Sequence, residues 1–298
     1  MKKSLTAVLI LLAWCSLPAA GQAPAFDHST FDDLLRAHVT EEGLVDYDAF
    51  GRSPEFGEYL QSLAEARPED LPQAERLAFW INAYNAYTIE LINRHQERES
   101  IRNINKTLGF ISGKGPWKER MAEVGGRTWT LDEMEHEIIR KEFQEPRIHF
   151  AVVCAALGCP PLRAEAYTGQ ELDRQLDGQT RAFLLESPAK NRVHPASGTV
   201  FLSPIFDWYR EDFPAGRRGL GAYLAEFFPT GPARALLEGG RFDVEFTDYD
   251  WSLNADRSQP ADGGEGGGGS RRTAEGESAY RSRPADAGPK RRGEPGCR

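Results

Sequence analysis

The sequence predicts an α+β protein, with a helix-rich N-terminal half around a central buried helix, packed against a small, mainly antiparallel sheet with hairpins. Apolar residues keep helical spacing through the first third of the chain, and hairpin signals begin after residue 115. Strands and helices do not alternate regularly, as they would in a doubly wound parallel sheet.

Three helices are predicted in the N-terminal half. The first follows possible N-caps at Ser29 and Thr30, and the second, over about residues 54–64, has proline in its first turn. A short extended piece at residues 43–47 separates them. The third helix, over residues 73–94, contains LAFWINAYNAYTIELI, whose apolar side chains cover most of its circumference, which is typical of a buried central helix.

The second half mixes hairpins and helices. MAEVGGRTWTL is typical of a hairpin with a two-glycine turn, and Thr130 with Glu133 forms a capping-box pattern that starts a helix through LDEMEHEIIRKEF. IHFAVVCAA, residues 148–156, is interpreted as a buried strand. The remaining predicted elements are a helix over about 169–186, a hairpin in RVHPASGTVFLSP, helical pieces in FDWYREDF and LGAYLAEFF, and an extended segment over 241–254.

The N-terminal residues 1–23 have the pattern of a cleaved signal peptide. Two lysines precede an apolar run over residues 5–17, which is too short for a membrane helix, and small residues follow. We therefore expect a periplasmic or secreted protein without a stable membrane span after cleavage. A lipoprotein signal is the alternative, but Trp14 stands before Cys15 where a small residue is required.

The C-terminal residues 257–298 contain no Leu, Ile, Val, Phe, Met or Trp, so we expect a disordered tail. Nine basic and six acidic residues give this tail a charge of +3, which leaves −12 on residues 1–256 of a chain whose net charge is −9. An acidic body argues against nucleic-acid binding. Residues 26–254 are predicted to form a single globular domain.

Several polar residues fall within apolar helical patterns. Glu135 lies on the inward face of its predicted helix with His136 on the flank, and it is either a structural acid bonded to a backbone turn or an arginine, or a catalytic acid. Asn82 and Asn85 lie three residues apart on the central helix. Their amides either tie that helix to a loop backbone or line a pocket.

The segment RIHFAVVCAALGCPPLR, residues 147–163, carries a histidine and two cysteines. On a strand, His149 and Cys154 would face opposite sides. Cys159 follows Gly158 and precedes two prolines, so we expect it to be the accessible cysteine, in a loop, and Cys154 to be the packed one.

Four interpretations of the cysteines remain open. They could form a disulfide, which an exported protein permits, or one could be a reactive thiol with His149, His136 or Glu135 as its partner. They could bind zinc together with the two histidines, although no CxxC or HxxxH pair is present. They could also be inert core residues. We predict no cofactor and no bound metal.

Five motifs follow one another within about residues 45–254: LAFWINAYNAYTI, LDEMEHEIIR, RIHFAVVCAALGCPPLR, LSPIFDWYREDF and YDWSLN. Together they resemble the family known as domain of unknown function 547. The family's name leaves its activity open. The resemblance implies that the following residues fall in motif cores: Asn82, Asn85, Glu135, His136, His149, Cys154, Cys159 and Pro160. Because the polar residues among them are concentrated in three separate segments, we expect them to converge on one site.

The leading functional hypothesis is a thiol-dependent hydrolase or acyl transferase acting on a peptide-like substrate. A cysteine would be the nucleophile and His149 or His136 the base, with Glu135 or Asn82 as the orienting group and Asn85 as an amide donor. The alternative is a non-enzymatic binding or scaffolding domain. In that case the polar motif residues are structural hydrogen-bond ties and the cysteine pair is a disulfide.

Overall fold

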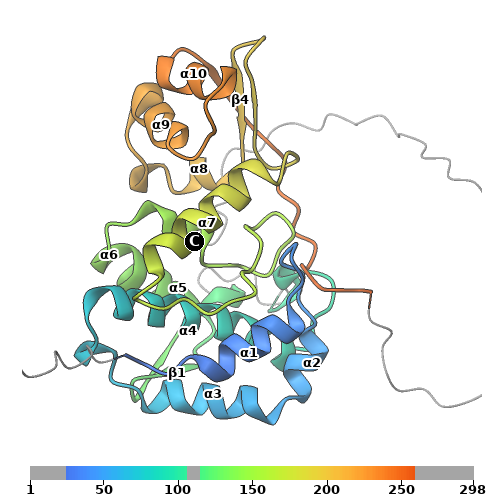
Figure 1. Ribbon diagram of the computed structural model, residues 1–298. Coiled ribbons are helices and arrows are strands. Elements are labelled where there is room, and N and C mark those ends of the chain that lie inside the picture. Colours follow the sequence, from blue (N-terminus) through green and yellow to red (C-terminus); the bar gives the residue numbers. More distant parts are fainter. Residues whose placement is uncertain (1–24, 106–114, 259–298) are drawn as a thin grey trace, which may run out of the picture.

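The computed structural model describes residues 25–105 and 115–258, so the predicted signal peptide and nearly all of the predicted tail lie outside the described residues (Figure 1). The α-helices are α1 (Ser29–His38), α2 (Tyr47–Arg52), α3 (Pro54–Glu65), α4 (Gln73–Arg94), α5 (Leu131–Glu133), α6 (Arg140–Glu142), α7 (Leu172–Leu185), α8 (Ile205–Trp208), α9 (Gly216–Ala225) and α10 (Pro232–Gly239). The strands are β1 (Ala122–Val124), β2 (Arg127–Trp129), β3 (Arg192–His194), β4 (Thr199–Leu202) and β5 (Asp243–Phe246). A π-helical turn, η5 (Met134–Ile139), joins α5 to α6, and short 3-10 helices are η1 (Pro68–Asp70), η2 (Ile101–Asn103), η4 (Pro116–Lys118), η6 (Pro146–Phe150) and η7 (Arg210–Asp212).

Helix α4 is the centre of the structure, as predicted. Fifteen of its 22 residues are buried, and the run 77–89 is buried without a break, so no face of that run is left to solvent. Figure 1 shows α4 between α1 and α3 on one side and α5 and α7 on the other. A helix that is apolar all round needs such neighbours on every side.

A second hydrophobic cluster lies in the C-terminal part of the chain, around α8, α9, α10 and the sheet that contains β4 (Figure 1). Phe150, Phe183, Phe206 and Phe213 are among its buried side chains. Tyr249 packs against both clusters. The residues around 150 and the segment at 249 therefore lie where the two apolar regions meet.

Two small sheets complete the α+β fold, which the sequence predicted. Strands β1 and β2 form an antiparallel hairpin whose Gly125 and Gly126 have φ of +61° and +71°, a backbone region that favours glycine. Strands β3 and β4 form a second antiparallel hairpin. β5 then joins β4 in parallel, because α8–α10 carry the chain back across, so this sheet is mixed.

The predicted strand over residues 148–156 is wrong. The chain there forms the 3-10 helix η6 and then a series of turns. The Asn85 side chain makes hydrogen bonds to this buried backbone that a neighbouring strand would otherwise make. Its side-chain amide donates to the carbonyl oxygen of Ala151 at 2.9 Å and accepts from the N–H of Val153 at 2.9 Å, which replaces part of a sheet ladder.

Two N-terminal predictions also differ from the structure. Residue His28, not Ser29 or Thr30, is the N-cap of α1. The extended piece at 43–47 is short, because the side chain of Asp46 accepts from the N–H of Ala49 at 2.9 Å and starts the unpredicted helix α2.

Within residues 25–105 and 115–258, the structure contains no helix with the length and apolar character needed to span a membrane.

Gly43 lies where the loop before α2 meets the cysteine-containing segment. Its φ is +78°, and a Cβ there would lie 2.5 Å from the backbone nitrogen of Leu162. We expect Gly43→Ala to lower the free energy of unfolding by about 2 kcal/mol or more, because strain adds to a backbone clash. Gly57→Ala is the matched control, since Gly57 lies inside α3 with open space around it. It should raise stability by about 0.5–1 kcal/mol. Urea unfolding measures the free energy of unfolding of both variants. Equal changes in the two would contradict the expected clash at Gly43.

Candidate functional site

Some of the predicted site residues meet at a small cavity of about 20 Å³, which has room for about one water molecule. Glu135, His149, Cys154 and Cys159 all line it. The other lining residues are Tyr84, Val152, Pro160, Ile205, Trp208, Tyr209 and Tyr249. The cavity thus gathers side chains from all five sequence motifs.

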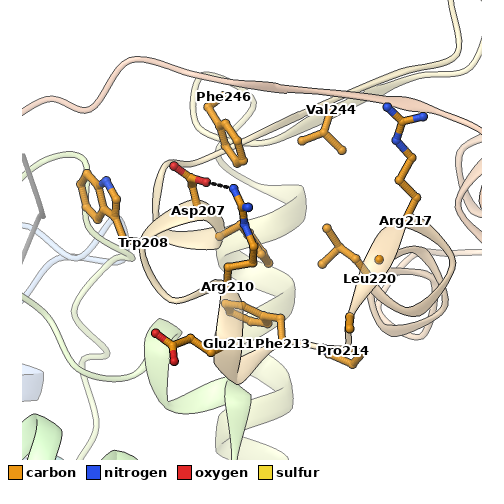
Figure 2. Close-up of a pocket in the computed structure, with 13 residues that line it drawn as sticks. Asp207, Trp208, Arg210, Glu211, Phe213, Pro214, Arg217, Leu220, Val244 and Phe246 are labelled. Atoms are coloured by element: carbon orange, nitrogen blue, oxygen red, sulfur yellow. Dashed lines mark hydrogen bonds and ion pairs between the residues drawn. The ribbon is translucent and has the colours of Figure 1, made fainter. Parts of the chain in front are cut away.

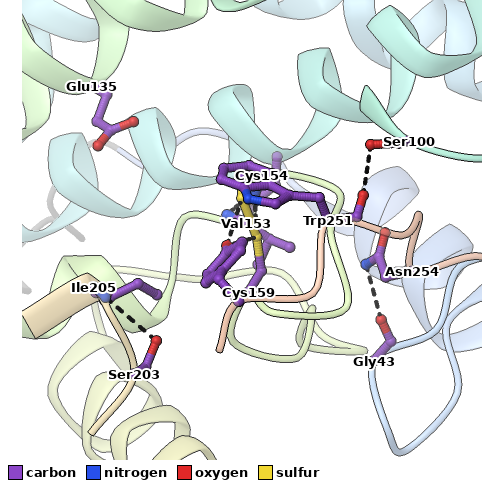
Figure 3. Close-up of a disulfide and its surroundings, with 12 residues drawn as sticks. Gly43, Ser100, Glu135, Val153, Cys154, Cys159, Ser203, Ile205, Trp251 and Asn254 are labelled. Atoms are coloured by element: carbon purple, nitrogen blue, oxygen red, sulfur yellow. Dashed lines mark hydrogen bonds between the residues drawn. A yellow bond between two sulfur atoms is a disulfide. The ribbon is translucent and has the colours of Figure 1, made fainter. Parts of the chain in front are cut away.

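Cys154 and Cys159 form a disulfide, with their sulfur atoms 2.24 Å apart (Figure 3). Both are buried, with exposed fractions of 5% and 1%, so the prediction that Cys159 is the accessible cysteine is wrong. The Cys159 sulfur accepts hydrogen bonds from the Cys154 N–H and from the Tyr249 hydroxyl, each at 3.1 Å. The Tyr249 hydroxyl also lies 3.1 Å from the Cys154 sulfur.

The disulfide loop is held by the C-terminal segment 249–254. The N–H of Leu157 donates to the carbonyl oxygen of Ser252 at 2.8 Å, and the N–H of Gly158 to that of Asp250 at 2.7 Å. A Cβ on Gly158 would lie 2.8 Å from the Tyr249 ring, so only glycine permits this approach. The turn that points the loop this way includes Ala155, whose φ of +58° is unusual for a residue with a side chain.

His149 is held by Asp212 and Tyr209. Its Nε2 lies 2.7 Å from the Asp212 carboxylate, and its ring stacks on Tyr209 with centroids 4.0 Å apart. Arg140 binds both oxygens of Asp212, at 2.6 and 3.0 Å. The second ring nitrogen of His149, Nδ1, is buried and has no hydrogen-bond partner among residues 25–105 and 115–258.

The electrostatics favour a neutral His149 beside an ionised Asp212. Burial lowers the pKa of His149, and it outweighs the opposing effect of the Asp212 hydrogen bond. Burial also disfavours the Asp212 carboxylate, but hydrogen bonds from His149 and Arg140 prevail and hold the pKa of Asp212 well below its usual value. Because a carboxylate only accepts, Nε2 of neutral His149 carries the proton and Nδ1 is left as an acceptor.

Glu135 reaches the cavity from the π-helical turn η5. The capping box at Thr130 and Glu133 starts the helix as predicted, but the N–H of Arg140 bonds to the carbonyl oxygen of Glu135, five residues back. Such wider turns often occur at functional sites. Glu135 is 2% exposed, and its Oε2 accepts from the Tyr84 hydroxyl at 3.3 Å, whereas its Oε1 is buried and has no partner within the described segments. The arginine bond considered for Glu135 is not among its contacts.

His136 does not line the cavity. Its Nδ1 lies 2.9 Å from Arg140, which in turn holds Asp212. Its ring also lies 6.4 Å from that of Tyr209, so His136 is linked to His149 through Arg140 and Asp212 and through Tyr209.

The two predicted asparagines are structural ties and do not line the cavity. The Asn82 amide donates to the carbonyl oxygen of Tyr167 at 2.8 Å and accepts from its N–H at 2.9 Å, in the way that Asn85 holds residues 151 and 153. Each of these amides donates one hydrogen bond to a backbone carbonyl oxygen and accepts one from a backbone N–H. Asn85 still matters to the site, because it holds the chain between His149 and Cys154.

Sequence reasoning missed four residues that complete the site: Tyr84, Tyr209, Asp212 and Tyr249. Tyr209 and Asp212 belong to LSPIFDWYREDF and Tyr249 to YDWSLN, two motifs for which no chemistry was predicted. The acidic and aromatic side chains within these two motifs were the signal that could have identified them as site residues. Their partners come from distant parts of the chain, so spacing alone did not reveal them.

Among the described residues, no three His, Cys, Asp or Glu side chains are arranged to hold a metal ion. The chemistry that the cavity's own side chains can support is proton transfer at His149 and sulfur chemistry at the cysteine pair.

The fold and cavity define an α+β protein with an enclosed disulfide, histidine and glutamate. Residues 68–184 match the family described as a protein of unknown function, DUF547, so the chain resembles that family over this segment. No curated protein and no solved structure matches the chain. The matched segment includes the first three motifs. The other two lie beyond it, yet they contribute Tyr209, Asp212 and Tyr249.

We expect Asp212→Asn to lower the free energy of unfolding by about 2 kcal/mol at pH 7, because Arg140 and His149 would lose their shared anionic partner. The control is Asp207→Asn in the same motif. Asp207 is exposed and pairs only with its neighbour Arg210, so the change should stay within about 0.5 kcal/mol. Urea unfolding of both variants tests this. Equal losses of unfolding free energy in the two variants would show that the contacts of Asp212 with Arg140 and His149 do not stabilise the site.

Proposed function

We propose that the protein is a thiol-dependent hydrolase or acyl transferase, in which the disulfide is the resting form and reduction frees the nucleophile. The observation that carries this proposal is the buried, unpartnered Nδ1 of His149, on a histidine that shares a cavity with both cysteines. A base held from behind by a carboxylate, with its other nitrogen free, is the arrangement that activates a nucleophile.

Cys159 is the better nucleophile of the two. Its sulfur accepts from the Cys154 N–H and the Tyr249 hydroxyl, and such bonds favour a thiolate over a thiol. The Lys190 ammonium donates to the Cys159 carbonyl oxygen at 2.6 Å and adds positive charge nearby. Burial lowers the pKa of Lys190 to about 8, so it is still mostly charged at pH 7.

The remaining residues take supporting roles. Asp212 orients His149, and Arg140 keeps Asp212 ionised. Glu135 offers one oxygen to whatever enters the cavity. Asn82 and Asn85 position the backbone and do not contact a substrate.

A substrate larger than water needs a way in, and an open groove of about 830 Å³ supplies a route. The groove is lined by aromatic and apolar side chains, including Phe213, Leu220 and Phe246, and Trp208 lines both the groove and the cavity. Figure 2 shows Trp208 at one end of the groove and Arg217 at the other. A groove of this size fits a peptide-like or acyl chain. Displacement of Trp208 would join it to Cys159.

The disulfide also supports the proposal that the chain is exported to the periplasm or secreted, because stable disulfides are rare in reducing compartments.

The test uses the full chain with Cys15→Ser and Cys297→Ser, which removes the other two thiols. After reduction, we expect it to hydrolyse members of a panel of ester, thioester and peptide substrates that the oxidised form leaves intact. Cys159→Ser and His149→Gln should each lower kcat/KM by about 100-fold or more. Cys154→Ser should be active without a reductant, because it cannot form the disulfide.

The control His194→Gln changes an exposed histidine in β3 and should keep full activity. Hydrolysis that survives both Cys154→Ser and Cys159→Ser would sink the proposal.

A second candidate function is a non-enzymatic binding or scaffolding domain, which the backbone ties of Asn82 and Asn85 favour. In that case Asn82→Ala and Glu135→Gln would weaken folding, and reduction would expose no activity on any substrate of the panel.

A further inference from the structure

We propose that the reduced Cys154 and Cys159 pair reduces hydrogen peroxide inside the small cavity and returns to the disulfide. The inference uses the same cysteines and histidine as the proposed hydrolase, but it requires no acyl substrate and no opening of the groove. It rests on three features: the size of the cavity, the unpartnered polar atoms that line it, and the contacts of the two sulfurs.

The size of the cavity selects a very small reactant. Its 20 Å³ hold about one water molecule, and the aromatic side chains of Trp208, Tyr209 and Tyr249 are among those that line it. Hydrogen peroxide has only one oxygen atom more than water. An organic hydroperoxide would have to displace at least one of these rings.

Two residues of the lining carry hydrogen-bond acceptors that have no partner in the described part of the chain. Oε1 of Glu135 and Nδ1 of His149 are both buried without a partner, on side chains that are 2% and 3% exposed. Both atoms accept hydrogen bonds, and hydrogen peroxide donates two. A buried acceptor without a partner is costly, so two of them around one small cavity indicate a polar occupant.

The side chains that line the cavity supply the groups for the two steps of peroxide reduction. Nδ1 of His149 takes the proton of the Cys159 thiol, and the thiolate attacks one peroxide oxygen. The O–O bond breaks, and the leaving oxygen takes the proton back from His149 and departs as water. Cys159 is then a sulfenic acid, oxidised by two electrons.

The second step closes the disulfide. The Cys154 thiol attacks the sulfenic sulfur, the S–O bond breaks, and the hydroxyl leaves with the Cys154 proton as a second water. In total, two thiols and one hydrogen peroxide give one disulfide and two waters. The two cysteines form their bond in the loop conformation that hydrogen bonds to residues 250–252 hold. This step therefore needs no change in the conformation of the loop. A small dithiol reductant restores both thiols and is itself oxidised to a disulfide.

The experiment uses the full chain with Cys15→Ser and Cys297→Ser, reduced with dithiothreitol and freed of it without air. One equivalent of hydrogen peroxide is added, and the free thiols, the remaining peroxide and the protein mass are followed. We expect one peroxide consumed and two thiols lost for each chain, with a rate constant about 100-fold or more above that of free cysteine. Cumene hydroperoxide should react at least about 10-fold more slowly, because it does not fit the cavity.

Three variants locate the steps. Cys154→Ser should stop at a sulfenic acid on Cys159 that dimedone traps, and Cys159→Ser should lose the fast reaction. Tyr249→Phe keeps the ring and removes only the hydroxyl bonded to sulfur, so it should fold and react about 10-fold more slowly. The exposed His194→Gln should react at the unchanged rate.

A rate no faster than that of free cysteine, or equal rates with both peroxides, would overturn the inference. Its failure is distinct from that of the proposed hydrolase. A reduced protein that cleaves acyl substrates but reacts slowly with peroxide refutes only the peroxide reaction. Fast peroxide reduction without acyl cleavage refutes only the hydrolase.

Discussion

The site depends on how the buried segment between His149 and Cys159 satisfies its backbone without a sheet. The Asn85 side chain supplies an acceptor to Val153 and a donor to Ala151 from the centre of α4. An unpaired backbone group buried at that depth would cost roughly as much as a lost hydrogen bond. Because one amide meets this need, the chain can turn twice within a few residues. His149 and both cysteines then face one cavity, which strand alternation would prevent.

A second constraint is the distribution of charge around that cavity. Arg140 and Asp212 remain partly exposed, with side-chain exposures of 19% and 27%, while the His149 side chain is almost fully buried at 1%. The ionised pair therefore keeps some hydration, and only a neutral ring and the Glu135 side chain extend into the apolar interior. Full burial of the ion pair would carry a large desolvation cost. At the boundary between the two hydrophobic clusters, the partly hydrated ion pair and the apolar interior lie next to each other.

The sequence predicted the parts whose causes are local. Apolar spacing fixed α4 to the residue, Gly125 and Gly126 marked the β1–β2 hairpin, and Thr130 with Glu133 marked a helix start. It also selected Glu135, His149, Cys154 and Cys159, which do share a cavity.

The errors have a non-local cause. The run IHFAVVCAA is apolar enough for a strand, but Asn85, more than 60 residues earlier, supplies the alternative bonds. Asp212 and Tyr249 become site residues only because the C-terminal part folds back onto the disulfide loop. The parallel pairing of β5 with β4 arises in the same return of the chain.

The same contacts that would activate Cys159 also enclose it, and this sets what chemistry the cavity can perform. Tyr249 and the Cys154 N–H favour a thiolate, but the Tyr249 ring and the segment behind it separate the sulfur from solvent. A thiolate in such a place reacts readily with whatever reaches it, so access decides the reaction. While the rings stay closed, only a reactant near the size of water enters. A peptide-like chain needs Trp208 to move, because Trp208 alone lines both the described cavity and the described groove. If either proposed reaction occurs, the position of Trp208 would determine whether a peptide-like chain or only a reactant near the size of water reaches the reduced cysteines.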